Sequence, residues 1–149
     1  VATVARTYRR ALDDYQRDPA LYAAHMDWYK EEIGKCTCRE FTTGFYYGKP
    51  DETTQIYDNS TYWKNYTYLG SVGGQDRQGR YGLEQRNKFS VGEMVEVMKP
   101  SGENIEATVR QIVDEEGRVM DSAPHAKQQI YVDLGVPLEE YDILRRKEL

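Results

Sequence analysis

The chain has 149 residues, of which 39% are hydrophobic and 30% are charged, and its formal net charge is −5. This length suggests one domain with at most an appendage, and the apolar share supports a modest core. The acidic balance argues against a surface that attracts nucleic acid everywhere, because phosphate binding draws on Lys and Arg, but it leaves room for a local basic patch.

The sequence contains neither a stretch long and apolar enough to span a membrane nor a signal peptide pattern. It begins with Val1 and opens inside a predicted helix, so we expect a piece of a longer protein, with the chemistry elsewhere. Its two cysteines, Cys36 and Cys38, are one residue apart, a spacing at which a disulfide is badly strained. The absence of a disulfide framework favours a reducing cytoplasm.

Residues 1–34 carry two helical stripes. Apolar side chains recur at steps of three and four residues, first at Val1, Val4, Tyr8, Leu12 and Tyr15, then at Tyr22, Met26, Tyr29 and Ile33. Asp18 is placed to cap the second helix, Pro19 suits its first position, and Gly34 is placed to end it. The pattern predicts a helical hairpin whose stripes pack on each other and the following domain, or on a partner.

Residues 35–65 change character. Aromatic side chains surround Gly44, which indicates an aromatic loop, and the polar residues 51–61 indicate a linker. Exposed aromatic rings beside glycine can stack on a base, or they can bury against a neighbouring domain, which is the alternative that we favour. Phe45 and Tyr46 are therefore candidate residues for binding a substrate or a partner.

Residues 66–149 alternate short apolar strands with turns rich in Gly and Asp. Strands are expected at 66–72, 80–86, 92–98, 105–109, 119–120 and 130–134. Ile112 and Val113 continue the fourth strand only with a change of face, for which a bulge near Arg110 would account. Turns at spacings of roughly eight to twelve residues predict a small antiparallel β-barrel. The fold class is thus α+β, with a helical hairpin (1–34), an aromatic loop and linker (35–65) and a β-barrel domain (66–149).

The stretch from Glu84 to Val97 shows the strand, polar corner and strand pattern most clearly. Arg86, Asn87 and Lys88 form a basic corner on an acidic protein. Such a corner can hold a phosphate or an acidic face, but we favour a solvated turn in which Arg86 pairs with a local carboxylate. Residues 145–147, which are all basic, are expected to form a solvated tail.

His125 is the other candidate residue for binding. A catalytic histidine needs a nucleophile or an orienting carboxylate nearby, and Asp121 and Ser122 form no recognised motif with it. We therefore expect a loop histidine that packs or hydrogen-bonds against the barrel. Cys36 and Cys38 have neither the spacing nor the further ligands of zinc and iron–sulfur sites. We expect no metal ligand, no cofactor and no catalytic residue in this chain.

Several stretches together resemble the carboxyl-terminal part of the U32 peptidases, the collagenase-like family. The similarity is carried by Val1-Ala2-Thr3-Val4, Tyr8-Arg9-Arg10-Ala11, Thr42-Thr43-Gly44-Phe45-Tyr46, Tyr68-Leu69-Gly70, Ala123-Pro124-His125 and Tyr141-Asp142-Ile143-Leu144-Arg145-Arg146. The most specific stretch is Glu84-Gln85-Arg86-Asn87-Lys88-Phe89, followed by Val91-Gly92-Glu93. Their order and spacing cover nearly the whole chain.

The resemblance implies a barrel-like catalytic region upstream of this chain, then a helical connection and a small, tightly wound β-barrel, which are the parts that this chain is similar to. Cys36 and Cys38 depart from the cysteine ligands of the family, which weakens an iron–sulfur assignment here. Some relatives are implicated in hydroxylating tRNA or ribosomal RNA rather than in cutting peptides. The family name therefore does not settle the reaction.

Two main functions are expected. The leading one is a noncatalytic accessory domain, a lid or a substrate-recruiting module, of a collagenase-like peptidase, with the missing catalytic domain as its partner. The alternative is an RNA-binding module of a family member that hydroxylates RNA, in which the basic corner and the aromatic loop form the contact. A self-association module is a third. All three are consistent with a cytoplasmic protein, and we assign no activity to the chain itself.

Overall fold

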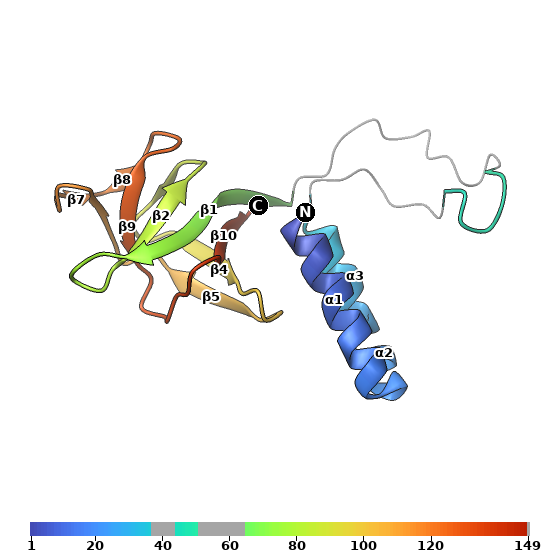
Figure 1. Ribbon diagram of the computed structural model, residues 1–149. Coiled ribbons are helices and arrows are strands. Elements are labelled where there is room, and N and C mark those ends of the chain that lie inside the picture. Colours follow the sequence, from blue (N-terminus) through green and yellow to red (C-terminus); the bar gives the residue numbers. More distant parts are fainter. Residues whose placement is uncertain (37–43, 51–64, 149) are drawn as a thin grey trace. The chain divides into compact units, whose positions relative to one another are not determined.

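The computed structural model describes residues 1–36, 44–50 and 65–148. The chain divides into two compact units, residues 1–65 and residues 66–149, which are described separately (Figure 1). The linker predicted at 51–61, the aromatic loop up to Thr43 and Cys38 lie outside the described residues. Cys36 is a half-buried free thiol.

The described residues of the first unit contain three helices, α1 (Ala2–Arg17), α2 (Pro19–Ala24) and α3 (Met26–Gly34). Asp18 caps α2 as predicted, because its Oδ1 accepts the Ala20 N–H at 2.9 Å and Pro19 occupies the first helical position. The single second helix that the sequence predicts is divided at His25, whose ring reaches across to α1. Within the described residues, no helix has the length and apolarity of a membrane crossing.

The contact between α1 and the other two helices is mainly polar. Arg6 forms a buried ion pair with Glu32, which also lies 3.1 Å from the ammonium group of Lys35. Further along the hairpin, the Asp14 carboxylate contacts His25 Nδ1 at 2.8 Å and Tyr29 Oη at 2.6 Å. The apolar stripe of α1 takes only a small part. Tyr15 makes an edge contact with the Tyr22 ring of α2, but Tyr8, Leu12 and Tyr15 all remain exposed.

The second unit contains ten strands. They are β1 (Tyr66–Gln75), β2 (Tyr81–Gln85), β3 (Phe89–Ser90), β4 (Met94–Met98), β5 (Asn104–Thr108), β6 (Gln111–Asp114), β7 (Val119–Met120), β8 (Ser122–Ala123), β9 (Gln129–Asp133) and β10 (Ile143–Lys147). Eight of them form one sheet in the order β5-β4-β10-β1-β2-β9-β6-β7, and β3 pairs with β8 in a separate two-stranded sheet (Figure 1). Every pairing is antiparallel.

The antiparallel sheet confirms the predicted α+β class, but the sheet order has two ends, β5 and β7. Closure into a barrel therefore stays a prediction. The change of face that the sequence predicts near Arg110 coincides with the gap between β5 and β6. The Val109 N–H donates to the carbonyl oxygen of Glu93, the residue before β4. The Arg110 N–H instead donates to the carbonyl oxygen of Asp133 of β9, at 2.9 Å. The chain thus changes its pairing partner between these two residues.

The basic residues near the end of the chain correct a prediction. Residues 145–147 are not a solvated tail, because they form part of β10 in the middle of the sheet, between β4 and β1. Arg145 is buried, pairs with Glu96 of β4 at 2.5 Å and lies over the Tyr66 ring. Arg146 pairs with Glu93 at 2.7 Å. Carboxylates on β4 and just before it offset the charges that made this segment look solvated.

Two hairpin turns of the sheet share one design. In the β1–β2 turn, Asp76 Oδ1 accepts the backbone N–H groups of Gln78 and Arg80, and the Arg80 Nε donates to the other carboxylate oxygen. Asp114 makes the same set of bonds in the β6–β7 turn, with Glu116 and Arg118. Such Asp side chains replace backbone partners in a turn, which explains the turns predicted at both sites.

The core of the second unit draws its residues from most strands of the two sheets. It is an apolar cluster that includes Leu69, Leu83, Phe89, Ile112, Ala123, Ile130 and Leu144. The second unit also contains a buried ion pair, in which Lys99 Nζ lies 2.7 Å from Asp142 Oδ2. The same carboxylate oxygen accepts the Glu139 N–H at 2.8 Å, so it fixes the loop that precedes β10.

Candidate nucleic-acid interface

The basic corner, Arg86, Asn87 and Lys88, is exposed and joins β2 to β3. It is held on β1 by two contacts. The Arg86 N–H donates to the Leu69 carbonyl oxygen at 2.7 Å, and the Asn87 side-chain amide donates to that of Tyr68 at the same distance. The corner therefore has a fixed backbone on the surface of the sheet.

A second loop, residues 124–127, lies beside the corner. Both loops leave the large sheet at the same place, where Gln85 follows the last pair of the β2–β9 ladder, and both enter the small sheet, where Phe89 pairs with Ala123. Two bonds from Gln85 join the loops. Its carbonyl oxygen accepts the Lys127 N–H at 2.7 Å, and its buried amide donates to Ala123 at 2.9 Å.

The positive charge of this surface comes from two lysines. Arg86 is paired with Glu84 at 2.5 Å, which confirms the predicted local ion pair. Arg146 donates to the Lys88 carbonyl oxygen, but its charge is offset by Glu93, whose hydrogen bond raises the pKa of Arg146. Lys88 and Lys127 are both exposed, and their ammonium groups have no ion-pair or hydrogen-bond partner within the described part of the chain.

An exposed aromatic ring borders the corner. Tyr68 is 42% exposed on β1, between the buried residues Thr67 and Leu69. We call the basic corner, Tyr68, His125 and Lys127 together the corner surface. Sequence reasoning missed Tyr68 and Lys127. The strand alternation around Tyr68 was a signal for the first residue. The position of Lys127 depends on the pairing of β2 with β9 and on its bond to Gln85, which no local sequence pattern predicts.

The other predicted site residues divide into two groups. His125 lies on the corner surface and is exposed, whereas a loop histidine packed or hydrogen-bonded against the barrel was expected. Phe45 and Tyr46 belong to the first unit and are 80% and 84% exposed, in a turn that also exposes Tyr47. Their contribution to the corner surface stays a prediction.

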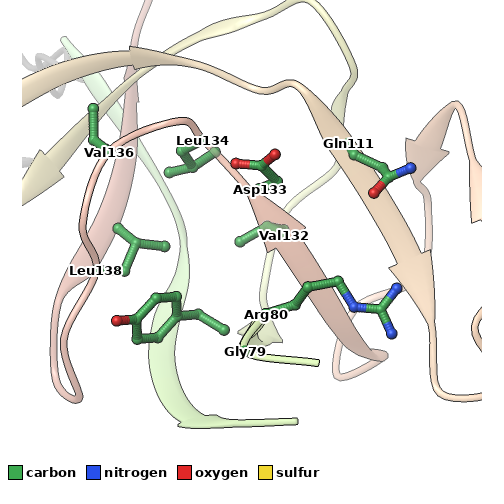
Figure 2. A pocket seen from close by; sticks show the side chains of 9 residues that line it. Gly79, Arg80, Gln111, Val132, Asp133, Leu134, Val136 and Leu138 are labelled. Atoms are coloured by element: carbon green, nitrogen blue, oxygen red, sulfur yellow. The ribbon is translucent and has the colours of Figure 1, made fainter. Parts of the chain in front are cut away.

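A separate pocket of about 270 Å³ lies on the second unit, at the other end of β2 from the corner. Leu134, Val136 and Leu138 gather on one side of it, and Arg80 extends toward the other (Figure 2). Arg80 is already held by Asp76 at 2.7 Å. Because its charged group is engaged within the protein, this pocket is a weaker candidate for an anionic ligand than the corner surface.

Comparison with known families identifies both units. Residues 64–145 match the description "Peptidase family U32 C-terminal domain", and residues 1–56 match "Peptidase family U32". The first match ends just before β10 is complete and covers the whole corner surface. The resemblance stated from the sequence is therefore confirmed.

Two curated relatives align with nearly the whole chain. The tRNA hydroxylation protein P1 of Bacillus subtilis (strain 168) is 32% identical over 147 residues, which are 98% of this chain and 35% of that protein. The tRNA hydroxylation protein P of Escherichia coli (strain K12) is 26% identical over 97% of this chain and 31% of its own length. The chain thus spans about a third of the length of these relatives.

Two solved structures are similar to part of the chain. Both are crystal structures of the C-terminal domain of a Geobacillus thermoleovorans protein assigned to the U32 peptidases, one of them a selenomethionine variant. The variant is 33% identical, with 54% of this chain and 99% of that chain covered and a TM-score of 0.49. The other structure is 35% identical, with 55% of this chain and 92% of that chain covered and a TM-score of 0.48. On the evidence of the family match, this chain belongs to peptidase family U32, and its second unit is the family's C-terminal domain.

Proposed function

We propose that this chain is a noncatalytic module of a tRNA hydroxylation protein and that it contacts the tRNA through the corner surface. The observation that carries the proposal is the 32% identity to the Bacillus subtilis tRNA hydroxylation protein P1 across 98% of the chain. This is the alternative that the sequence resemblance offered beside a collagenase-like peptidase. An accessory role fits a surface whose chemistry is binding.

The corner surface has the parts that RNA binding needs. The ammonium groups of Lys88 and Lys127 can contact phosphates without breaking an ion pair of the described structure. The exposed ring of Tyr68 offers a face on which a base can stack. Since the loops are tied together through Gln85, the backbone segments that carry the two lysines are fixed before the ligand arrives.

The fold supports a rigid platform for this surface. We propose that the sheet closes into the small barrel that the sequence predicts, because residues 104–114 pair with β4 in their first half and with β9 in their second half. Such a bent segment connects the end strand β5 with β6, which lies next to the other end of the sheet order, and so can close the sheet. Small barrels commonly serve as modules for binding nucleic acid.

A tRNA titration of the chain at about 50 mM and about 200 mM salt tests the proposal. We expect binding at the lower salt that weakens severalfold at the higher, because a few phosphate contacts release counterions. No binding at the lower salt would remove the proposal. A duplex DNA of equal length serves as the competitor that measures how much of the binding is nonspecific.

A second experiment tests the peptidase hypothesis, which the sequence favoured. The purified chain and its complete parent protein are incubated with collagen, gelatin and generic peptides. We expect no turnover by the chain. Turnover by the chain that one substitution abolishes would contradict a noncatalytic role, and turnover by the parent alone would return the peptidase hypothesis.

A further inference from the structure

The outer face of α1 carries an apolar stripe that the other described residues of the first unit leave largely exposed. Val4, Tyr8, Leu12 and Tyr15 recur at steps of three and four residues, and they are 39%, 60%, 54% and 56% exposed. The exposed large hydrophobic residues of the second unit (Tyr68, Val91, Met94, Val119 and Tyr141) are instead distributed over separate strands and loops. Scattered apolar side chains are normal on a surface, whereas an ordered stripe marks an interface.

The side of α1 that faces the other two helices is mainly polar, which makes the exposed apolar stripe more unusual. α1 meets α2 and α3 mainly through Arg6, Arg10 and Asp14, so the polar side of this helix is turned inward. Of the stripe, Tyr15 reaches the other helices, through an edge contact with Tyr22. An amphipathic helix normally buries its apolar stripe. The orientation of α1 is explained if a further body packs on the outer face while Glu32 and Asp14 hold the helices together.

A second copy of the chain is a poor occupant for this stripe. A helix of 16 residues is about 24 Å long and about 10 Å wide, so its face covers roughly 240 Å² in projection. Even doubled for side-chain relief, this is below the roughly 800 Å² per partner of a stable interface. A body on the same polypeptide needs less area, because covalent attachment gives it a high effective concentration.

The family matches indicate which body this is. The stripe lies in residues 1–56, which match the general U32 family description and not that of the C-terminal domain. The aligned segment is only 35% and 31% of the two curated relatives, so most of their length lies outside it. We propose that the stripe of α1 docks on this remaining part of the U32-family polypeptide.

Tyrosine nitration followed by mass spectrometry tests the proposal. The 149-residue chain and the complete product of the gene that encodes it are treated with tetranitromethane. Tyr8 and Tyr15 report on the stripe, and the exposed Tyr141 of the second unit is the internal control. We expect Tyr8 and Tyr15 to react at least tenfold more slowly in the complete product than in the chain, with Tyr141 unchanged.

A pair of variants separates docking from a general change in reactivity. Leu12→Glu places a charge in the stripe, and Ala23→Glu places the same charge at an exposed residue of α2. In the complete product, Leu12→Glu is expected to restore the nitration of Tyr8 and Tyr15, whereas Ala23→Glu leaves it slow. In the chain alone, neither variant changes the rates.

Three results would overturn the docking proposal. They are equal nitration in the two forms, a complete product with no residues beyond this chain, and protection within the chain alone that grows with its concentration, which would indicate a second copy. None of these readouts involves RNA. Failure of tRNA binding would therefore leave this inference standing, and its own failure would leave the proposed function standing.

Discussion

The side-chain amide of Gln85 lies 2.9 Å from the carbonyl oxygen of Ala123, 38 residues further along the chain. The Gln85 side chain is fully buried, and its backbone oxygen also accepts the Lys127 N–H. One residue at the end of β2 thus fixes both loops of the corner surface. A buried polar side chain in this role is expensive to remove, because its partner loses a hydrogen bond in a place that water does not reach.

Replacing Gln85 by Ala is expected to lower the free energy of unfolding by about 2 kcal/mol or more, from the lost hydrogen bond and the cavity together. Denaturant unfolding measures this change. The exposed neighbour Gln129→Ala is the control and should shift the midpoint little. Equal effects of the two substitutions would show that Gln85 does not hold the loops.

The buried pair of Lys99 and Asp142 gives a second prediction. Lys99→Met leaves the Asp142 carboxylate in the interior without its cation, so we expect a loss of about 3–5 kcal/mol. The double variant with Asp142→Asn should recover part of this loss, because no charge is then buried. A double-mutant cycle from denaturant unfolding measures the coupling, and additive effects would contradict it.

The raised pKa of Tyr29 leads us to expect an alkaline transition in the first unit. Burial, followed by its hydrogen bond to Asp14, raises the pKa of Tyr29 to about 12. A pKa raised in the folded state means that the contribution to stability is present below the unfolded value of about 10 and is lost as the pH rises through about 12. Absorbance at 295 nm should show a late tyrosine step that Tyr29→Phe removes and Tyr8→Phe retains.

The same contact predicts the opposite behaviour in acid. The hydrogen bond from Tyr29, followed by that from His25, lowers the pKa of Asp14. A lowered folded pKa stabilises the hairpin above the ordinary carboxyl pKa of about 4, and this contribution is lost as the pH falls through the folded value. Helical circular dichroism should therefore fall in acid at a higher pH in Tyr29→Phe than in the wild type. Identical acid transitions would argue against this network.

The sequence predicted what local chemistry determines. Asp18 and Pro19 start α2 because a capping side chain and a missing N–H act within one turn of helix. The corner between Gln85 and Phe89 followed from the strand pattern on its two sides. The division of the second helix at His25 was not predicted, because it accompanies a contact with Asp14 of another helix.

The errors concern residues whose neighbours lie far away in the chain. Arg145 looked solvated because its own segment is basic, but the register of β10 with β4 places it opposite Glu96. Lys127 reaches the corner surface through the long-range pairing of β2 with β9 and through its backbone bond to Gln85. The outward direction of the α1 stripe was likewise undecided, because the periodicity defines a face without saying what covers it.

The salt dependence of tRNA binding by two neutralised variants tests the central claim most directly. Lys88→Gln and Lys127→Asn each remove a charge that has no ion-pair partner among the described residues, and Asn suits the positive φ of 65° at Lys127. Arg77→Gln removes an exposed charge in the β1–β2 turn, at the opposite end of β2, and is the matched control. The slope of log affinity against log salt is measured for the wild type and each variant.

If the corner surface binds tRNA, Lys88→Gln and Lys127→Asn each weaken binding at low salt and reduce the magnitude of the slope by about 1, while Arg77→Gln changes neither. Unchanged slopes in both lysine variants, or an equal change in Arg77→Gln, would contradict the assignment of this surface to RNA.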